Sequence, residues 1–500
     1  MQFFNQFMKM VEELSSEQFS LSIARVDFLN YYYNNLTSLV QFFYYLADEN
    51  SKTTFLKLLK YNMATALCGF QNAIKKYCLF DLQQWGAYTR RAAHIQKIPP
   101  SALDHYYSLD KIETFILEGY NYNNLVYASE GDYVLDCGAY TGNTAVYFHE
   151  KIGSTGKVYS FEPHPATFKV LQNNLKNYNI NLYNCALSKD NKSVKFSQTP
   201  MPGAQIKDDA VGTIEVPCIT IDQFVAENHI PKIDFIKMDI EGAEVDALIG
   251  ASNTIKTFKP KLAICIYHKV EDFKTILEKI IEINNNYVFF IKHNSYSFLE
   301  TVLFAIDKNK LDQSKYVTLL PSQESILDET NSVKTSWNIF NNIYMNKEKL
   351  LRKNHLDQYR LILKTKYKLD CNFIYDTVHY NSLKIMINQK HNLYYAIAYV
   401  NTEDLISISV AFYFPPQFKN IEHILNLIRD KLHTSDIIYK FNVRESYALG
   451  FKIDDITNYD YVCFLFAYLI KNSLDVLLEH NLVSNDFSYQ LHNSGFTNTL

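Results

Sequence analysis

Between residues 120 and 306, short runs rich in β-branched and aromatic residues alternate with segments of helical length. Strand-like runs such as Tyr133–Cys137, Phe235–Asp239 and Lys261–Tyr267 are each followed by a helical pattern. This alternation predicts βαβ units and therefore a mostly parallel, doubly wound sheet. The last two of these runs are apolar on both faces, as strands covered by helices on both sides are. We expect an α/β domain over residues 119–308.

Glycine is concentrated in the same region. The chain has 14 glycines, and ten of them lie between Gly119 and Gly250. The sequence is rich in Asn, Lys, Tyr and Phe, which is typical of an AT-rich genome and removes glycine wherever another residue will serve. The remaining glycines therefore indicate positions where a side chain cannot be tolerated.

The two flanks have other patterns, and 500 residues is long for a single core. Residues 1–118 contain helix-length apolar patterns, which predict a helical N-terminal region. Residues 309–365 are interpreted as a polar linker with one helix. Residues 366–500 are expected to form an α+β accessory domain, with a three-strand meander within Leu383–Phe414 and a long helix around Tyr461–Glu479. Either flank could support a homo-oligomer.

Composition and charge narrow the partners and the compartment. The formal net charge is −4, so the chain lacks the basic footprint of a nucleic-acid-binding protein. It has no run of 18 or more apolar residues and no signal-peptide pattern at the start, so we expect no membrane span. The eight cysteines form no C-x-x-C pair, and several lie in apolar runs. This usage favours reduced thiols and a cytoplasmic protein.

The most informative motif is Asp132-Tyr-Val-Leu-Asp136-Cys-Gly138-Ala-Tyr-Thr-Gly142-Asn-Thr144. It predicts a strand that ends at Asp136, a glycine turn, and a helix whose first N–H groups are free for a polar ligand. Glu162 ends the next strand, twenty positions after Gly142. A carboxylate at that place can accept both hydroxyls of an adenosine ribose.

Two cofactor classes compete for such a unit. A dinucleotide site usually has the spacing G-x-G-x-x-G and brings a pyrophosphate to the helix end. Here the spacing is D-x-G-x-x-x-G, and Asp136 would repel pyrophosphate but favour an ammonium and a sulfonium. The pattern therefore favours S-adenosylmethionine over NAD. We expect the cofactor to contact Asp136, Gly138, Ala139, Tyr140, Gly142, Asn143, Thr144, Glu162, Pro163 and Asp239.

Polar residues also end two further strands of the predicted sheet. One stretch is Lys237-Met-Asp239-Ile-Glu241-Gly-Ala-Glu244, and the other ends in Tyr267-His268. Open α/β sheets bind substrates at the carboxyl ends of their strands. Glu244 is interpreted as an acid that complements the helix dipole. The candidate catalytic residues are His268, Asp239, Glu241 and Lys237, with His293 and Glu300 as weaker candidates.

Together these motifs resemble the FkbM family of S-adenosylmethionine-dependent methyltransferases over roughly residues 120–306. The resemblance is carried by Val134-Leu-Asp-Cys-Gly-Ala-Tyr-Thr-Gly-Asn-Thr144, Phe161-Glu-Pro163, Ile219-Thr-Ile-Asp222, Phe235-Ile-Lys-Met-Asp-Ile-Glu-Gly-Ala-Glu244, Pro260-Lys-Leu-Ala-Ile-Cys-Ile-Tyr-His268 and His293…Glu300-Thr-Val-Leu-Phe304. It implies a class I methyltransferase Rossmann-like sheet with an antiparallel last strand. It also implies O-methylation of a sugar, glycan or polyketide hydroxyl.

An alcohol is a poor nucleophile at neutral pH, so a base or a divalent metal should assist the transfer. Our hypothesis makes His268 the base, while Asp239 and Glu241 orient the acceptor or hold Mg²⁺ together with His268. A metal-free site is equally compatible with these residues. Two alternatives stay open: a non-catalytic binding or assembly module on a methyltransferase-like core, and a NAD-dependent enzyme.

Overall fold

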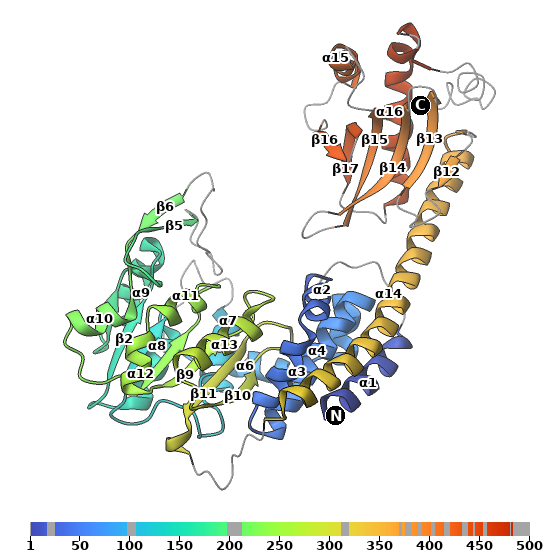
Figure 1. The fold of residues 1–500 in the computed structure, drawn as a ribbon. Coiled ribbons are helices and arrows are strands. Elements are labelled where there is room, and N and C mark those ends of the chain that lie inside the picture. Colours follow the sequence, from blue (N-terminus) through green and yellow to red (C-terminus); the bar gives the residue numbers. More distant parts are fainter. Residues whose placement is uncertain are drawn as a thin grey trace. The chain divides into compact units, whose positions relative to one another are not determined.

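The structure is a computed structural model, shown in Figure 1. It describes residues 2–17, 26–97, 107–197, 213–311, 320–369, 373–375, 382–388, 393–401, 406–414, 421–432, 439–443, 446–453, 458–480 and 482–483. The chain divides into two compact units, which we describe separately. The first contains Gln71–Asn338 with Met1–Leu14 and Arg25–Thr65, and the second contains Ile339–Leu500 with Ser15–Ala24 and Ala66–Phe70.

A seven-stranded sheet in the order β10-β11-β9-β8-β1-β2-β3 forms the centre of the first unit (Figure 1). Its strands are β1 (Tyr133–Cys137), β2 (Lys157–Phe161), β3 (Asn181–Tyr183), β8 (Phe235–Met238), β9 (Lys261–Cys265), β10 (Tyr287–His293) and β11 (Thr301–Asp307). The five strands from β3 to β9 run parallel, and β11 is antiparallel to both β9 and β10. The predicted doubly wound α/β sheet with an antiparallel last strand is therefore confirmed. The strand order reverses between β1 and β8, which is where such sheets bind ligands.

The helices that connect these strands are α8 (Asn143–Ile152), α9 (Pro165–Leu175), α10 (Ile221–Glu227), α11 (Glu244–Ile249), α12 (Ser252–Phe258) and α13 (Asp272–Ile283). Two small ladders lie beside them: β4 (Ala186–Leu187) with β7 (Cys218–Ile219), and β5 (Val194–Ser197) with β6 (Thr213–Val216). The sequence pattern from Gly242 to about Ile255 predicts a single helix, and this prediction is wrong, because the chain breaks between α11 and α12. A Cβ atom on Gly250 would lie 2.1 Å from the carbonyl oxygen of Ser188, so the break packs against a distant backbone segment.

The N-terminal region of the first unit is helical, as its apolar spacing predicts. Its helices are α1 (Gln2–Ser15), α2 (Val26–Asn34), α3 (Leu36–Tyr45), α4 (Glu49–Cys68), α5 (Phe70–Tyr77), α6 (Leu82–Ala92), α7 (Tyr107–Lys111) and the π-helix η1 (Ile112–Ile116). Of these, α1, α4 and α5 have residues in both units. The rings of Phe3, Phe7 and Trp337 are buried together, with a ring stack of 5.4 Å between Phe7 and Trp337.

Trp337 belongs to α14 (Gln323–Thr365), a helix of 43 residues that follows the short 3-10 turn η2 (Lys308–Lys310). The sequence suggested a polar linker with one helix here, and the helix occupies most of that stretch. The polar composition misleads because the buried apolar residues of α14, among them Ile326, Val333, Trp337 and Phe340, are separated by polar ones. Such spacing is helical, and many of the positions between these residues are polar and exposed.

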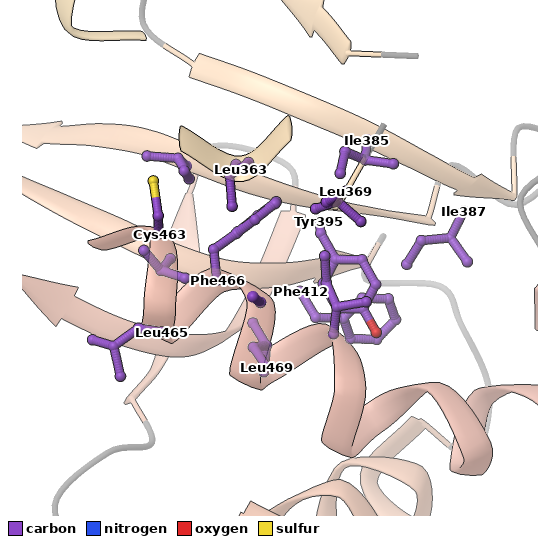
Figure 2. Close-up of a cluster of buried hydrophobic side chains, with 14 of the residues drawn as sticks. Leu363, Leu369, Ile385, Ile387, Tyr395, Phe412, Cys463, Leu465, Phe466 and Leu469 are labelled. Atoms are coloured by element: carbon purple, nitrogen blue, oxygen red, sulfur yellow. The ribbon is translucent and has the colours of Figure 1, made fainter. Parts of the chain in front are cut away.

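The second unit contains a six-stranded antiparallel sheet in the order β12-β13-β14-β15-β17-β16. Its elements are β12 (Phe373–Tyr375), β13 (Ser382–Asn388), β14 (Leu393–Asn401), β15 (Ile406–Phe414), α15 (Ile421–Leu432), β16 (Tyr439–Val443), β17 (Ser446–Ile453) and α16 (Tyr459–Glu479). Figure 2 shows Tyr395 and Phe412 of the sheet packed with Phe466 of α16 in the buried core. The predicted meander and long helix are confirmed, whereas no sequence pattern indicated β12. The predicted domain boundaries remain predictions.

No helix in the described part of the chain has both the length and the hydropathy that a bilayer crossing requires. The seven cysteines within the described ranges all carry free thiols: Cys68, Cys78, Cys137, Cys185, Cys218, Cys265 and Cys463. Cys371, Gly203 and Gly212 lie outside the described residues.

Candidate active site

The glycine turn after β1 needs its glycines for geometric reasons. Gly138 has φ +88°, and a Cβ atom there would lie 1.9 Å from the carbonyl oxygen of Asp239. Gly142 has φ +109°, and its Cβ atom would press against Leu171 and Leu175 of α9. Both positions therefore exclude a side chain, as the glycine distribution predicts. The carbonyl oxygen of Asp239, directly after the end of β8, occupies the space that a side chain at position 138 would need.

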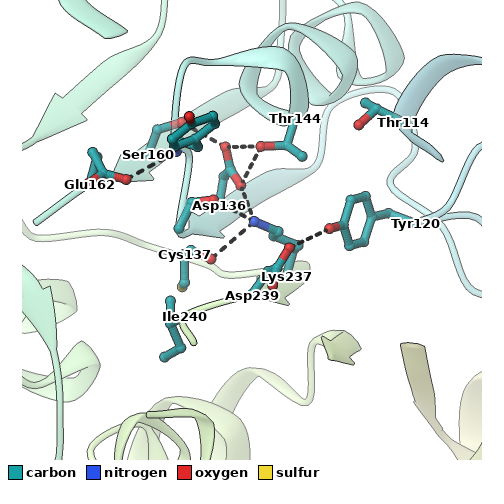
Figure 3. A network of polar contacts seen from close by, with 12 residues as sticks. Thr114, Tyr120, Asp136, Cys137, Thr144, Ser160, Glu162, Lys237, Asp239 and Ile240 are labelled. Atoms are coloured by element: carbon teal, nitrogen blue, oxygen red, sulfur yellow. Dashed lines mark hydrogen bonds and ion pairs between the residues drawn. The ribbon is translucent and has the colours of Figure 1, made fainter. Parts of the chain in front are cut away.

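Asp136 and Lys237 form a buried ion pair beneath this turn, with 3.4 Å between Nζ and Oδ1 (Figure 3). Thr144 and Ser160 donate their hydroxyls to Asp136 at 3.0 and 3.2 Å. Lys237 also donates to the carbonyls of Cys137 at 3.2 Å and Gly138 at 2.7 Å. Lys237 thus ties β8 to the glycine turn, and its contacts favour support of the turn over contact with an acceptor.

The charges of this pair compensate each other. Burial raises the pKa of Asp136, while Lys237 and the two hydroxyls act in the opposite direction. Burial lowers the pKa of Lys237, but the carboxylates of Asp136 and Asp239 outweigh it and hold this pKa above its usual value. Because Lys237 already balances its charge, Asp136 shapes the turn more directly than it attracts a cation.

Glu162 follows the last residue of β2 with its carboxylate already oriented. One oxygen accepts the backbone N–H of His164 at 2.9 Å, and the other accepts that of Tyr140 at 3.2 Å. Asn184 holds the same corner by donating to the carbonyls of Glu162 and Pro163. Burial raises the pKa of Glu162 to about 7, although the two backbone N–H groups oppose this shift.

Several buried polar atoms around the turn have hydrogen-bonding capacity to spare. Thr141 Oγ1 and Asn143 Oδ1 find no partner among the described residues. Asn143 uses only its amide group, which donates to Asp110 at 2.6 Å. Unsatisfied buried atoms are costly unless a ligand or water meets them. Together with the oriented Glu162, they fit a polar ligand of the cofactor type.

At the carboxyl ends of β8 and β9, the structure brings His268, Asp239 and Glu241 together. His268 Nε2 lies 3.3 Å from Asp239 Oδ1 and 3.6 Å from Glu241 Oε2. Tyr120 and Tyr267 each donate a hydroxyl to Asp239 at 3.2 Å. Asp239 therefore stands between the imidazole and two phenols, close to the backbone of the glycine turn.

Glu244 belongs to this group, although its position in the sequence indicated only an interaction with the helix dipole. Its Oε1 lies 3.0 Å from His268 Nδ1 and accepts the backbone N–H of Ile240 at 2.9 Å. Its side chain is 1% exposed, so it does more than complement the dipole of α11. The signal in the sequence is Gly242: with φ +95°, it turns the chain so that Glu241 and Glu244 reach the same imidazole from two sides.

The carboxylates stabilise the protonated form of the imidazole. Burial lowers the pKa of His268, but Asp239 and Glu244 raise it well above its usual value. Burial acts to raise the pKa of Asp239, yet His268 and Lys237 bring it below its usual value. The site is therefore an imidazolium–carboxylate cluster near neutral pH, and removal of a proton from His268 requires a higher pH.

The structure groups possible metal ligands differently from the prediction. Ligand atoms of Glu244, His268 and Asp272 all lie within 4.8 Å of one another. Within the described ranges, these three residues are the group that could hold a metal ion. The expected set was Asp239, Glu241 and His268. Burial raises the pKa of Asp272 to about 7, and this carboxylate accepts the N–H of Lys269. The Nδ1 edge of the imidazole thus faces the closer set of carboxylates, whereas its Nε2 edge faces Asp239.

Two further carboxyl groups interact with Asp239. Burial, and then the charge of Asp239, raise the pKa of Glu300 to about 8, and Glu300 has φ +63°. Burial and the charge of Glu300 likewise raise the pKa of Glu113, which lies in the π-helix η1. No sequence motif marked Glu113. The other weak candidate, His293, contacts Thr301 instead of this cluster.

A sheet of this order, with an acid-and-glycine turn after its first strand, defines a class I Rossmann-like methyltransferase domain. Residues 136–300 match the family described as the methyltransferase FkbM domain, and this stretch of the chain is such a domain. The residues on either side of it lie outside the match.

The relatives that match are distant. The hexuronic acid methyltransferase AglP of Haloferax volcanii is 27% identical over 133 residues, which are 26% of this chain and 54% of that protein. The chain therefore spans about half the length of that relative. Methyltransferase 1 of Beauveria bassiana is 24% identical over 178 residues, covering 30% of this chain and 71% of that protein. The crystal structure of the FkbM methyltransferase from Methylobacillus flagellatus KT is similar with a TM-score of 0.40 and 21% identity, over 56% of this chain and 62% of that chain.

Proposed function

We propose that this protein is an S-adenosylmethionine-dependent O-methyltransferase that acts on a hydroxyl of a sugar, glycan or related metabolite. The observation that carries the proposal is the placement of the His268–Asp239 pair directly beside the glycine turn. Gly138 and Asp239 are so close that a Cβ atom on Gly138 would lie 1.9 Å from the carbonyl oxygen of Asp239. A ligand on the turn and an acceptor at the strand ends would therefore meet at Asp239.

The residues present fit S-adenosylmethionine, which when bound supplies an electrophilic methyl group on a sulfonium. The carboxylate of Glu162 has room to accept ribose hydroxyls beyond its two backbone contacts. Thr141 Oγ1 and Asn143 Oδ1 offer further contacts to polar parts of the cofactor. Asp239, whose pKa lies below its usual value, places negative charge where an ammonium group would be favoured.

The neutral form of His268, which becomes more populated as the pH rises, would take up the hydroxyl proton of the acceptor as the methyl group moves from the sulfonium to the acceptor oxygen. Glu244, buried behind the ring, fixes the orientation of the imidazole from Nδ1 and leaves Nε2 toward Asp239. Asp239 and Glu241 would orient the acceptor oxygen, because methyl transfer requires alignment of the reacting atoms in a water-poor site. A hexuronic acid methyltransferase among the relatives supports a sugar-like acceptor.

Calorimetric titration with S-adenosylhomocysteine tests the cofactor assignment. We expect the wild-type protein to bind it and Glu162→Ala to lose binding. Glu282→Gln removes an exposed carboxylate paired with Lys279 and serves as the matched control that keeps binding. Binding of NAD alone would refute the proposal, and absence of any binding would support the alternative of a non-catalytic module.

Divalent metal and compartment belong to the same proposal. Mg²⁺, if used, would be held by His268 with the neighbouring carboxylates, of which Glu244 and Asp272 are the closest set. Loss of activity in EDTA and rescue by Mg²⁺ would establish that requirement, and full activity in EDTA would refute it. The free thiols support a reducing compartment such as the cytoplasm.

A further inference from the structure

Four aromatic rings gather where the N-terminal helices meet the connection between β10 and β11. Trp85 of α6 lies 5.6 Å from Phe80, 6.3 Å from Tyr88 and 5.1 Å from Tyr296, measured between ring centroids. Cys78 holds the two segments together by donating its thiol to the carbonyl of Tyr296 at 3.5 Å. We call Phe80, Trp85, Tyr88 and Tyr296 the Trp85 cluster.

The exposure of these rings differs from that of an ordinary aromatic core. All four residues of the Trp85 cluster are partly exposed. In the N-terminal core of the same unit, Phe3 and Phe7 are completely buried and Trp337 is 2% exposed. Part of each side chain of the Trp85 cluster thus remains accessible, and partly exposed aromatic groups that lie together are typical of binding surfaces.

A buried polar atom borders the cluster without a partner. His293 is 8% exposed, its ring centroid lies 6.2 Å from that of Phe80, and its Nε2 finds no hydrogen bond among the described residues. Its other nitrogen, Nδ1, contacts the hydroxyl of Thr301 at 2.9 Å. Burial lowers the pKa of His293 to about 4 and outweighs the opposing effect of the Ser295 and Ser297 backbone, so the ring is neutral and Nε2 either donates or accepts. A ligand hydroxyl satisfies both tautomers because it can accept or donate.

The Trp85 cluster is connected to the proposed acceptor edge through one short loop. The loop that carries Tyr296 begins after His293 and ends at Glu300, whose carboxyl group interacts with Asp239. At its start, Asn294 donates to the carbonyl of Gly119 at 3.4 Å. Tyr120, which follows Gly119 in the chain, donates its hydroxyl to Asp239. A ligand that spans this loop could therefore reach the reacting groups.

We propose that the Trp85 cluster and His293 form an acceptor subsite that binds a pyranose ring of a glycan. A pyranose has a face of C–H groups that packs on aromatic faces and an edge of hydroxyl groups that hydrogen-bonds with neutral polar atoms. In this arrangement the C–H face lies on Trp85 and Tyr296, and a ring hydroxyl meets His293 Nε2. The inference rests on the proposed function and assigns a substrate class to that same site.

The two tryptophans of the chain make the subsite measurable by fluorescence. Trp85 is in the cluster, and Trp337 is buried in a separate core. The full-length protein is titrated with the methyl β-glycosides of glucose, glucuronic acid and N-acetylglucosamine. We expect a saturable change in emission with at least one glycoside in wild type and in Trp337→Phe, but not in Trp85→Phe. Tyr296→Ala and His293→Ala should each weaken the affinity roughly tenfold.

Circular dichroism melting of each variant checks that it folds, and Trp337→Phe is the matched tryptophan control. The subsite is overturned if no glycoside changes the emission, or if the change persists in Trp85→Phe. Titration with S-adenosylhomocysteine on the same preparations separates the two proposals. If it binds and the glycosides do not, the subsite fails and the transferase stands. If the glycosides bind in a Trp85-dependent way but S-adenosylhomocysteine does not bind, the proposed transferase function is refuted and the subsite stands.

Discussion

Removal of the Lys237 ammonium should strongly destabilise the first unit. The substitution Lys237→Met leaves a side chain of similar length but deletes the ion pair with Asp136 and the hydrogen bonds to the carbonyls of Cys137 and Gly138. Both charged groups are completely or almost completely buried, so Asp136 would keep an uncompensated charge. Breaking a buried pair on one side costs about 3–5 kcal/mol.

For a domain of this size, 1 kcal/mol corresponds to roughly 2–4 °C in melting temperature. We therefore expect the melting temperature of the first unit to fall by about 10 °C in Lys237→Met, measured by circular dichroism. The double variant with Asp136→Asn should recover part of this loss, because it removes the stranded charge. Lys189→Met breaks the exposed pair with Asp246 and should cost less than about 1 kcal/mol.

The reasoning fails if Lys237→Met melts like Lys189→Met. It also fails if the effects of Lys237→Met and Asp136→Asn simply add, because additivity would mean that the two groups do not interact.

Three further predictions concern the turn and the ionisable groups. Gly138→Ala should prevent stable folding of the domain or lower its melting temperature by more than about 10 °C. Gly131 has a similar φ, but a Cβ atom there would make only an ordinary contact of 3.5 Å with Thr155 Oγ1, so Gly131→Ala should cost only roughly 1–2 kcal/mol in thermal melting. Asp239 and Glu244 raise the pKa of His268, so the neutral form that can act as a base becomes more populated as the pH rises. We therefore expect kcat/KM to rise about tenfold per pH unit from pH 7, and a flat pH–rate profile would contradict the base role. Since the pKa of Glu162 is about 7, S-adenosylhomocysteine should bind more tightly at pH 8 than at pH 6, and this difference should vanish in Glu162→Gln.

Much of the sheet could be predicted from sequence because burial on both faces leaves a distinct signal. The apolar strands Phe235–Met238 and Lys261–Cys265 need no partner information to be recognised. The break between α11 and α12 could not be predicted, because its cause is contact of Gly250 with the distant carbonyl of Ser188. The length of α14 could not be predicted for a different reason: its apolar residues are few and are separated by polar ones, so the stretch resembles a linker.

Those site residues that directly follow the carboxyl ends of parallel strands could be predicted from the sequence. The meeting of Asp239 and His268 follows from parallel strands whose carboxyl ends share one edge. The roles of Lys237 and Glu244 depended on side-chain direction, which residue spacing alone does not give. Glu113 could not be found from sequence, because it comes from a helical segment before the sheet and no motif surrounds it.

Transfer of a labelled methyl group tests the central claim most directly. Wild type and Asp239→Asn are incubated with methyl-tritiated S-adenosylmethionine and glycans from a lysate of the source cells. The account predicts label on a sugar in a form that resists mild alkali, as a methyl ether does, and little label with Asp239→Asn. Absence of label with the wild-type protein, or label released by alkali as from a methyl ester, would contradict it.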